Sequence, residues 1–302
     1  CESKSTSIEE SDKINIVTTL FPQYDFARAI GGDKVDVTLL LPAGMESHSY
    51  EPTPADIIKI NKSDLFIYTG ESMEQWAHSI IESVDSEDVY VLDVSQNIAL
   101  LAPTAGEEEP DHDHEHEEGE EEHSEHEGHN HTYDPHIWTS PKNAMVMVNN
   151  VLEALCAVDP KNESYYQANA KAYLKELEAL DQELEEVVAQ ATHDIIYHGG
   201  RFAMQYLTTQ YDLNYVSAPF EAEPSAALVA QMITEIKENN IPAIFYEELV
   251  DPKIAQMISD ETGAQMLLLH SCHNVSKEDF NHGVTYLSLM KQNVENLRVG
   301  LN

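Results

Sequence analysis

The chain is poor in cysteine, in basic residues and in long apolar runs. None of its three cysteines, Cys1, Cys156 and Cys272, belongs to a CxxC pair, which excludes a thiolate zinc site of the finger type. Lysine and arginine number 16 against 55 aspartates and glutamates, so the formal net charge is −39. A field of that sign repels nucleic acid and anionic lipid and attracts cations. No run approaches the roughly eighteen apolar residues of a membrane span.

Histidine among acids is what the chain has in excess. Eight of its fifteen histidines lie between Glu107 and His136, and the tract up to His131 is almost entirely His, Asp, Glu and Gly. Such a composition cannot build a core, so we expect a solvated, disordered loop over residues 105–132. Imidazoles among carboxylates hold metals such as Zn²⁺. We predict weak, auxiliary metal binding by the histidines of this loop: His112, His114, His116, His123, His126, His129 and His131.

Outside the tract, short β-branched apolar runs alternate with amphipathic helical segments. Candidate strands are 13–19, 35–41, 64–69, 89–94, 194–197, 213–217, 243–246 and 265–269, and candidate helices are 22–30, 74–84, 141–158, 202–210, 226–239, 252–262 and 283–297. This alternation predicts an α/β fold with parallel sheets flanked by helices. Ligands in such sheets bind beyond the carboxyl ends of the strands.

One long helix divides the pattern. Residues from Asn162 to about Ala191 contain no Gly or Pro and carry apolar residues at helical spacing. We therefore predict a tether over 1–12, an N-terminal α/β lobe over 13–160, a linking helix over 161–191 and a C-terminal α/β lobe over 192–302. A ligand site is expected in the cleft between the lobes.

Four histidines fall where loops and strand ends would meet in that cleft. His48 lies in the loop after strand 35–41, and His136 follows the tract. His198 ends strand 194–197, and His270 ends strand 265–269. Four neutral imidazoles satisfy tetrahedral Zn²⁺. His273, three residues beyond His270, is a reserve ligand.

Several motifs resemble one family. GMESHSYEPTPAD at 44–56 is similar to the PHxYEPTPxD signature of the zinc- and manganese-binding solute-binding lipoproteins of bacterial ABC importers (cluster A-I). DPHIWTSPKNA after the His-rich loop and TYLSLMKQNVENL near the end also resemble that family. The resemblance implies that His48 and His136 are metal ligands. It also implies a capture or sensing loop beside the cleft.

The resemblance is less complete for the other two ligands. The family usually has its third His five residues before a Tyr that opens a helix, but here Arg201 stands at that distance from Tyr206. The prediction that His198 is the third ligand therefore depends only on its place at a strand end. The family's late Asp ligand corresponds to His270, and an all-nitrogen shell favours Zn²⁺ over Mn²⁺. Whether His198 or a neighbour is the third ligand, and whether His273 takes part, stays open.

These observations predict an extracytoplasmic, high-affinity zinc receptor that delivers Zn²⁺ to an ABC permease and its ATPase. Cys1 and the polar residues after it are typical of a mature lipoprotein, so we expect a monomer held at the outer face of the cell membrane by a lipid on Cys1 alone. A manganese receptor of the same family and a zinc-storage or adhesin lipoprotein are alternatives.

A zinc hydrolase is a further alternative, but HExxH and GxSxG motifs are absent, so we expect no enzyme. A Cys156–Cys272 disulfide also stays open.

Overall fold

The computed structural model describes residues 13–47, 50–70, 74, 76–84, 88–103, 133–218 and 222–302. Cys1, His48 and the seven histidines predicted to bind metal in the tract lie outside these residues. No helix within these ranges is long and apolar enough to cross a membrane.

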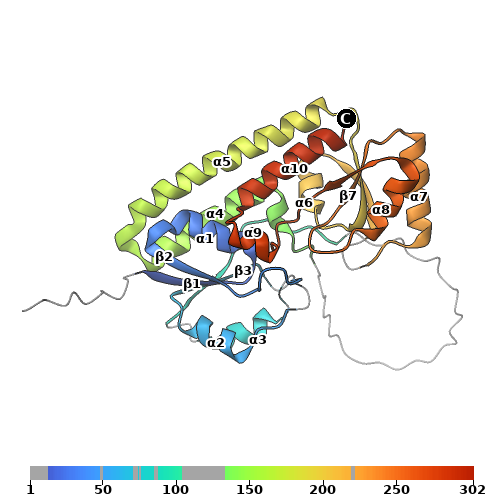
Figure 1. The fold of residues 1–302 in the computed structure, drawn as a ribbon. Helices are drawn as coiled ribbons and strands as arrows, with labels where there is room; N and C mark the ends of the chain where they lie inside the picture. The colour runs from blue at the N-terminus through green and yellow to red at the C-terminus, as the bar shows by residue number, and fades with distance from the viewer. Residues whose placement is uncertain are drawn as a thin grey trace, which may run out of the picture.

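The first sheet is parallel and has the strand order β2-β1-β3-β4. Its strands are β1 (Ile14–Thr18), β2 (Val35–Leu39), β3 (Leu65–Tyr68) and β4 (Tyr90–Asp93). Helices α1 (Phe21–Gly31) and α4 (Pro141–Val158) cover one face, and α2 (Pro54–Asn61) and α3 (Ala77–Ile81) lie on the other (Figure 1). Both faces are buried, as the continuous apolar runs of the strands require.

The second sheet repeats this arrangement in the order β6-β5-β7-β8, again parallel. It contains β5 (Ile195–Arg201), β6 (Asn214–Ala218), β7 (Ala243–Tyr246) and β8 (Gln265–Leu268). Connecting helices are α6 (Gln205–Gln210), α7 (Ala226–Glu238) and α8 (Lys253–Thr262). The chain ends with α9 (Lys277–Asn281) and α10 (Tyr286–Gly300). The predicted two-lobed α/β fold is confirmed.

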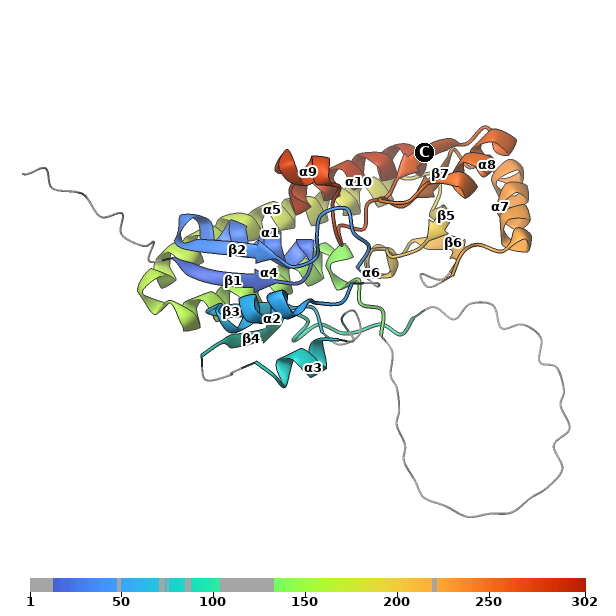
Figure 2. The same cartoon turned by 60° about the horizontal axis from the view of Figure 1, so that its bottom comes forward.

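The predicted linking helix is α5, which spans Glu163–Gln190 and contains 28 residues. At 1.5 Å per residue it is about 42 Å long. It runs along both lobes, with α10 beside it (Figures 1 and 2). Its buried residues recur at helical spacing, as a helix that packs along one face requires: Tyr166, Ala170, Tyr173, Leu177, Leu180, Leu184 and Val187.

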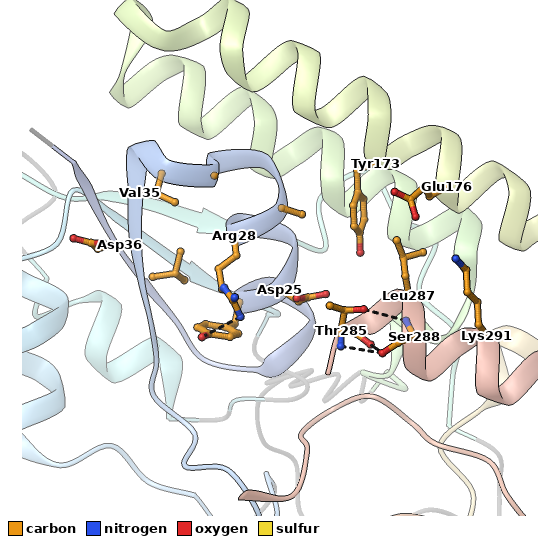
Figure 3. Close-up of a pocket in the computed structure, with 14 residues that line it drawn as sticks. Asp25, Arg28, Val35, Asp36, Tyr173, Glu176, Thr285, Leu287, Ser288 and Lys291 are labelled. Atoms are coloured by element: carbon orange, nitrogen blue, oxygen red, sulfur yellow. Dashed lines mark hydrogen bonds between the residues drawn. The ribbon is translucent and has the colours of Figure 1, made fainter. Parts of the chain in front are cut away.

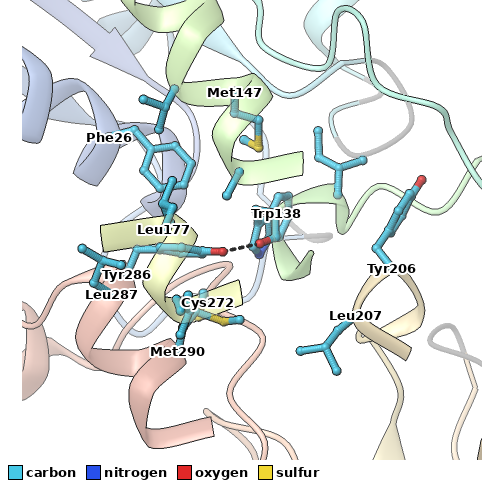
Figure 4. Close-up of a cluster of buried hydrophobic side chains, with 14 of the residues drawn as sticks. Phe26, Trp138, Met147, Leu177, Tyr206, Leu207, Cys272, Tyr286, Leu287 and Met290 are labelled. Atoms are coloured by element: carbon cyan, nitrogen blue, oxygen red, sulfur yellow. Dashed lines mark hydrogen bonds between the residues drawn. The ribbon is translucent and has the colours of Figure 1, made fainter. Parts of the chain in front are cut away.

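One apolar core extends through both lobes. It joins Ile16 of β1 and Phe26 of α1 to Phe245 of β7 through α4, α5 and α10. Trp138 and Tyr286 lie at its centre, where the Tyr286 hydroxyl donates to the Trp138 carbonyl at 2.6 Å (Figure 4). The lobes are therefore packed onto a common spine and are not joined by a bare linker.

Five elements differ from the sequence-based prediction. Helices α3 and α6 each begin three residues later than predicted. Strand β5 continues through Gly199 and Gly200. Glycine is required at position 199 because a Cβ there would lie 2.9 Å from the Ala255 backbone of α8. Helix α9 was not predicted. The last helix begins later than expected because Thr285 forms a capping box with Ser288.

The two cysteines in the described ranges, Cys156 and Cys272, are free thiols, so the disulfide left open by the sequence is not formed in this structure.

Candidate functional site

The two sheets share a topology that places a ligand site at a specific edge. In each sheet the second strand in the chain lies on one side of the first strand, and the third strand lies on its other side. The order of strands therefore reverses between β1 and β3 and between β5 and β7, and the carboxyl ends of these strands are the switch points. Such points are where open α/β sheets bind ligands. The segment after β8 reaches the first sheet, because Phe21 N donates to the His273 carbonyl at 3.3 Å. The two edges therefore face each other.

The loop after β2, which leads to His48, is fixed by the other lobe. The buried Asn274 donates from Nδ2 to the carbonyls of Pro42 and Met45, both at 2.8 Å. Gly44 N donates to the Val275 carbonyl at 2.7 Å. These bonds hold residues 42–45 against the segment that carries His273.

The YEPTPAD motif fixes the chain on the other side of His48. Thr53 caps α2, its hydroxyl accepts from Asp56 N, and Asp56 accepts in return from Thr53 N. Pro54 occupies the first turn, where its missing N–H costs nothing. The Tyr50 hydroxyl donates to Asp56 at 3.1 Å. This motif is therefore a helix start that anchors the loop, although His48 itself lies outside the described residues.

His136 is buried and held by a carboxylate. Asp134 Oδ1 lies 2.8 Å from His136 Nδ1 and also accepts from the His136 backbone N–H at 2.9 Å. Because an ionised carboxylate only accepts, Nδ1 carries a proton, and Nε2 is the nitrogen that this tautomer offers to a metal. Carboxylate–histidine pairs of this kind orient metal ligands. The following Trp138 donates to the Ser271 carbonyl of the other lobe at 2.6 Å.

The ends of the His-rich tract meet beside this pair. Asp134 N donates to the Leu101 carbonyl at 2.8 Å, and the Tyr206 hydroxyl of α6 bridges the Asp134 carbonyl and Leu101 N at 2.6 and 3.0 Å. The tract therefore leaves the fold after Leu101 and re-enters it at Asp134, two residues before His136.

His198 lies inside β5, in register with Phe245 of β7, and not at the strand end that we predicted. Its ring is buried, and burial lowers its pKa from 6.5 to about 4, so it is neutral at physiological pH. Gly200 N donates to Nδ1 at 3.2 Å, which leaves the ring proton on Nε2.

His273 has the arrangement of His136, with Glu248 as its carboxylate. Glu248, just after β7, lies 2.8 Å from His273 Nδ1, and the Ser271 hydroxyl lies 2.7 Å from the same nitrogen. It also accepts from Ser271 N at 2.9 Å and from the Ser271 hydroxyl. Burial alone would raise the pKa of Glu248, but attraction to His270 and hydrogen bonds from His273 and Ser271 lower it. His273 Nε2 is buried and has no hydrogen-bond partner in the described part of the chain.

His270, the predicted fourth ligand, is turned the other way. It follows β8 as expected and is buried, and burial lowers its pKa. Its Nδ1 accepts from Cys272 N at 2.9 Å, so the proton of the neutral ring lies on Nε2. Its backbone N–H donates to Asn293 Oδ1, and its carbonyl accepts from Asn293 Nδ2, both at 2.8 Å. Those contacts suit a structural histidine better than a metal ligand.

A small pocket lies between His198 and His273, and neither His136 nor His270 lines it. Its volume is about 60 Å³, enough for an ion. Both lobes line it, with Gly44 and Glu46 from the first and the following from the second: His198, Arg201, Ala203, Met204, Glu247, Glu248, Leu249, Val250, Leu269, Ser271 and His273. Among the described residues, no three His, Cys, Asp or Glu side chains form a group that could hold a metal. The set His48, His136, His198 and His270 therefore stays a prediction.

Two carboxylates of this region escaped the sequence reasoning. Glu248 follows a parallel strand directly, so strand-end logic could have found it. Asp134 stands two residues before His136, a spacing that permits the ring contact.

Comparison with known proteins agrees with this architecture. A model of the family described as "ZnuA: Zinc-uptake complex component A periplasmic" matches residues 16–300. The chain is 37% identical to the high-affinity zinc uptake system protein ZnuA of Bacillus subtilis, across 99% of this chain and 91% of that protein. It is 35% identical to the zinc-binding lipoprotein AdcA of Streptococcus pneumoniae (strain TIGR4), across 97% of this chain but only 57% of AdcA, so it corresponds to part of that longer relative.

The fold is shared as well. The crystal structure of the Zn(II)-bound ZnuA-like domain of Streptococcus pneumoniae AdcA superposes with a TM-score of 0.78 at 30% identity, covering 96% of this chain and 99% of that domain. By sequence over residues 16–300 and by fold, the chain belongs to the ZnuA family of zinc-binding solute receptors, which are not enzymes.

Proposed function

We propose that this protein is an extracytoplasmic receptor that binds Zn²⁺ as cargo between its lobes and delivers it to an ABC permease and its ATPase. The observation that carries the proposal is the pair His136 and His273. In each, Nδ1 lies 2.8 Å from a buried carboxylate that holds the Nδ1 proton, so Nε2 is the nitrogen that can bind a metal. The names of the relatives, a zinc uptake protein and a zinc-binding lipoprotein, support the same cargo.

The proposed ligands are His48, His136, His198 and His273. His273 replaces His270 because its Nε2 is buried without a partner, whereas the Nδ1 lone pair of His270 is engaged by Cys272 N. His198 lines the same pocket as His273. Its Nδ1 also accepts a backbone N–H, from Gly200, but at 3.2 Å this contact is longer than the 2.9 Å bond that His270 accepts, so His198 loses less when it turns to a metal. Four imidazole nitrogens suit Zn²⁺ better than Mn²⁺, which prefers oxygen.

Competition calorimetry with a zinc chelator tests this ligand set. His136→Ala and His273→Ala are each expected to weaken zinc binding by more than the roughly 10–100-fold typical of losing an outer-shell group. His270→Ala is the matched control, since it removes an equally buried histidine from the same segment, and should change the affinity by less than about tenfold. Mn²⁺ should compete poorly with Zn²⁺ for the wild-type protein.

Two results would contradict the proposal in different ways. Loss of tight binding in His270→Ala, with His273→Ala unaffected, would restore His270 as the fourth ligand. Absence of any tight zinc event in the wild-type protein would reject the receptor itself.

We also propose attachment to the outer face of the cell membrane through a lipid on Cys1, as the lipoprotein name of pneumococcal AdcA suggests. Cys1→Ser should move the protein from the membrane fraction to the soluble fraction of cells that produce it with its export signal. Equal partition of both proteins would exclude the anchor.

A further inference from the structure

A second cavity lies apart from the histidines, among α1, the edge strand β2, α5 and the start of α10 (Figure 3). Its volume is about 760 Å³, within the range of small-molecule sites. None of the proposed zinc ligands lines it. Its lining combines buried polar groups, two cations and apolar side chains.

The floor of this groove holds a buried hydroxyl that has no hydrogen-bond partner in the described part of the chain. Tyr173 of α5 is 8% exposed, and its ring packs edge-on against Phe26 with centroids 5.9 Å apart. Its hydroxyl has no hydrogen-bond partner in the described residues and points into the groove toward Asp25 (Figure 3). Buried hydroxyls are almost always paired, so this group lacks a partner that a ligand atom could supply.

Asp25 supplies an acceptor beside it. This buried carboxylate accepts from Tyr286 N, the first residue of α10, at 2.8 Å. Only one oxygen is used in that bond, and the structure shows no further hydrogen bond to Asp25 within the described ranges. Together, Tyr173 and Asp25 can receive a hydrogen-bond donor that carries positive charge.

The walls supply the opposite charge. Of the three arginines in the chain, Arg201 and Arg298 pair with Glu223 and Glu295 at 3.6 and 3.5 Å. Arg28 has no carboxylate within ion-pair distance among the described residues, and its guanidinium lies 5.1 Å above the Tyr24 ring.

Lys291 of α10 lines the other side of the groove, and no ion pair is formed by it in the described part of the chain. Both cations are exposed, so they can pair with an anionic group that enters the groove.

We propose that this groove binds an aliphatic α-amino acid. Its ammonium pairs with Asp25 and the Tyr173 hydroxyl, and its carboxylate pairs with Arg28 or Lys291. The aliphatic side chain packs against Val35, Val37 and Leu287, which also line the groove. A simple anion fits less well, because Asp36 and Glu176 join Asp25 in the lining and give it a net negative charge.

Calorimetry with L-leucine on the full, metal-free chain tests the proposal, and two analogues dissect it. The probe 4-methylpentanoate lacks the ammonium of leucine, and 3-methylbutylamine lacks its carboxylate. Leucine should bind with 1:1 stoichiometry. Each analogue should bind at least about tenfold more weakly, because one charge-assisted contact is lost. Equal binding of all three compounds, or no binding of leucine, would overturn the proposal.

Variants locate the site. Tyr173→Phe keeps the ring packing and removes only the hydroxyl, and Arg28→Gln removes the cation. Each should weaken leucine binding at least about tenfold while zinc affinity stays unchanged. Arg298→Gln, which alters a paired arginine of the same protein, is the control and should bind leucine as the wild type does. Unchanged leucine binding in both Tyr173→Phe and Arg28→Gln would overturn the assignment.

Discussion

Two buried carboxyl groups show how surroundings decide the charge of a residue. Glu248 accepts hydrogen bonds from Ser271 and His273, and its pKa is lowered despite burial. Glu74, which follows β3, accepts from Thr69 N at 2.7 Å and from the Thr19 hydroxyl. Burial outweighs these bonds and raises the pKa of Glu74 from 4.5 to about 8. Glu248 is therefore a charged partner for His273, whereas Glu74 keeps its proton at neutral pH.

The raised pKa of Glu74 predicts a pH dependence of stability. The folded state holds this proton and the unfolded state releases it between pH 4.5 and about 8, so the free energy of unfolding falls as the pH rises through that window. The slope is at most about 1.4 kcal/mol per pH unit. Glu74→Gln removes the titration, so its melting temperature should rise relative to the wild type as the pH increases from 4.5 to 8.

Thermal unfolding followed by circular dichroism at several pH values measures this difference. Glu178→Gln, on the exposed face of α5, is the control, and its difference from the wild type should not grow with pH. A constant offset for Glu74→Gln across the window would contradict a protonated, buried Glu74.

At the scale of elements, the segment after β8 organises the candidate site. Residues 271–275 carry His273, accept the Trp138 indole N–H and hold the loop that leads to His48. Asn274 is the central contact, since its single amide group bonds two carbonyls of that loop. The loop that leads to the proposed ligand His48 thus depends on a side chain from the second lobe.

Asn274→Ala is expected to free the loop over residues 42–47. The lost hydrogen bonds leave the partly exposed carbonyls of Pro42 and Met45 without these partners, at a cost of about 0.5–1.5 kcal/mol. Zinc affinity should fall roughly tenfold, and hydrogen exchange of residues 42–47 should speed up. Asn296→Ala removes an amide that bonds the Leu268 carbonyl at 2.7 Å, away from the loop, and serves as control. Equal exchange in the loop of both variants would refute the anchoring role of Asn274.

At the scale of the whole molecule, one core and one spine hold the two lobes together, and the His-rich tract is attached at a single closed base. That base is the Leu101–Asp134 hydrogen bond, which keeps the two ends of the tract side by side. Because the fold does not need the tract to hold these ends, removal of the tract should leave the lobes intact.

Deletion of residues 107–131, with a short Gly-Ser bridge between the flanks, separates the receptor from a storage protein. One tight zinc event should remain in calorimetry, and only weaker zinc binding should disappear, since a segment whose composition predicts no packed core loses conformational entropy when it binds metal. The melting temperature of the metal-free protein should be nearly unchanged. Loss of the tight event together with the tract would favour zinc storage and would reject a metal site built from the two lobes.

Much of the architecture followed from local patterns. Alternating apolar runs located both parallel sheets, and unbroken helical spacing located α5 to within a residue at each end. The strand-end position of His270 was also correct. The continuation of β5 through Gly199 and Gly200 was not predicted, because a pair of glycines locally indicates a turn. Only the structure shows that α8 packs so closely on Gly199 that no larger residue fits there.

The sequence by itself determined the fold class, the family and the chemistry of the cargo, since periodicity, motif and residue type are local properties of the chain. Which ring nitrogen each histidine offers was decided only by tertiary structure. His270 and His273 are three residues apart and equivalent in sequence, but Cys272 N engages the lone pair of one and Glu248 takes the proton of the other. Glu248 reaches His273 from a neighbouring strand, and no local pattern encodes that contact.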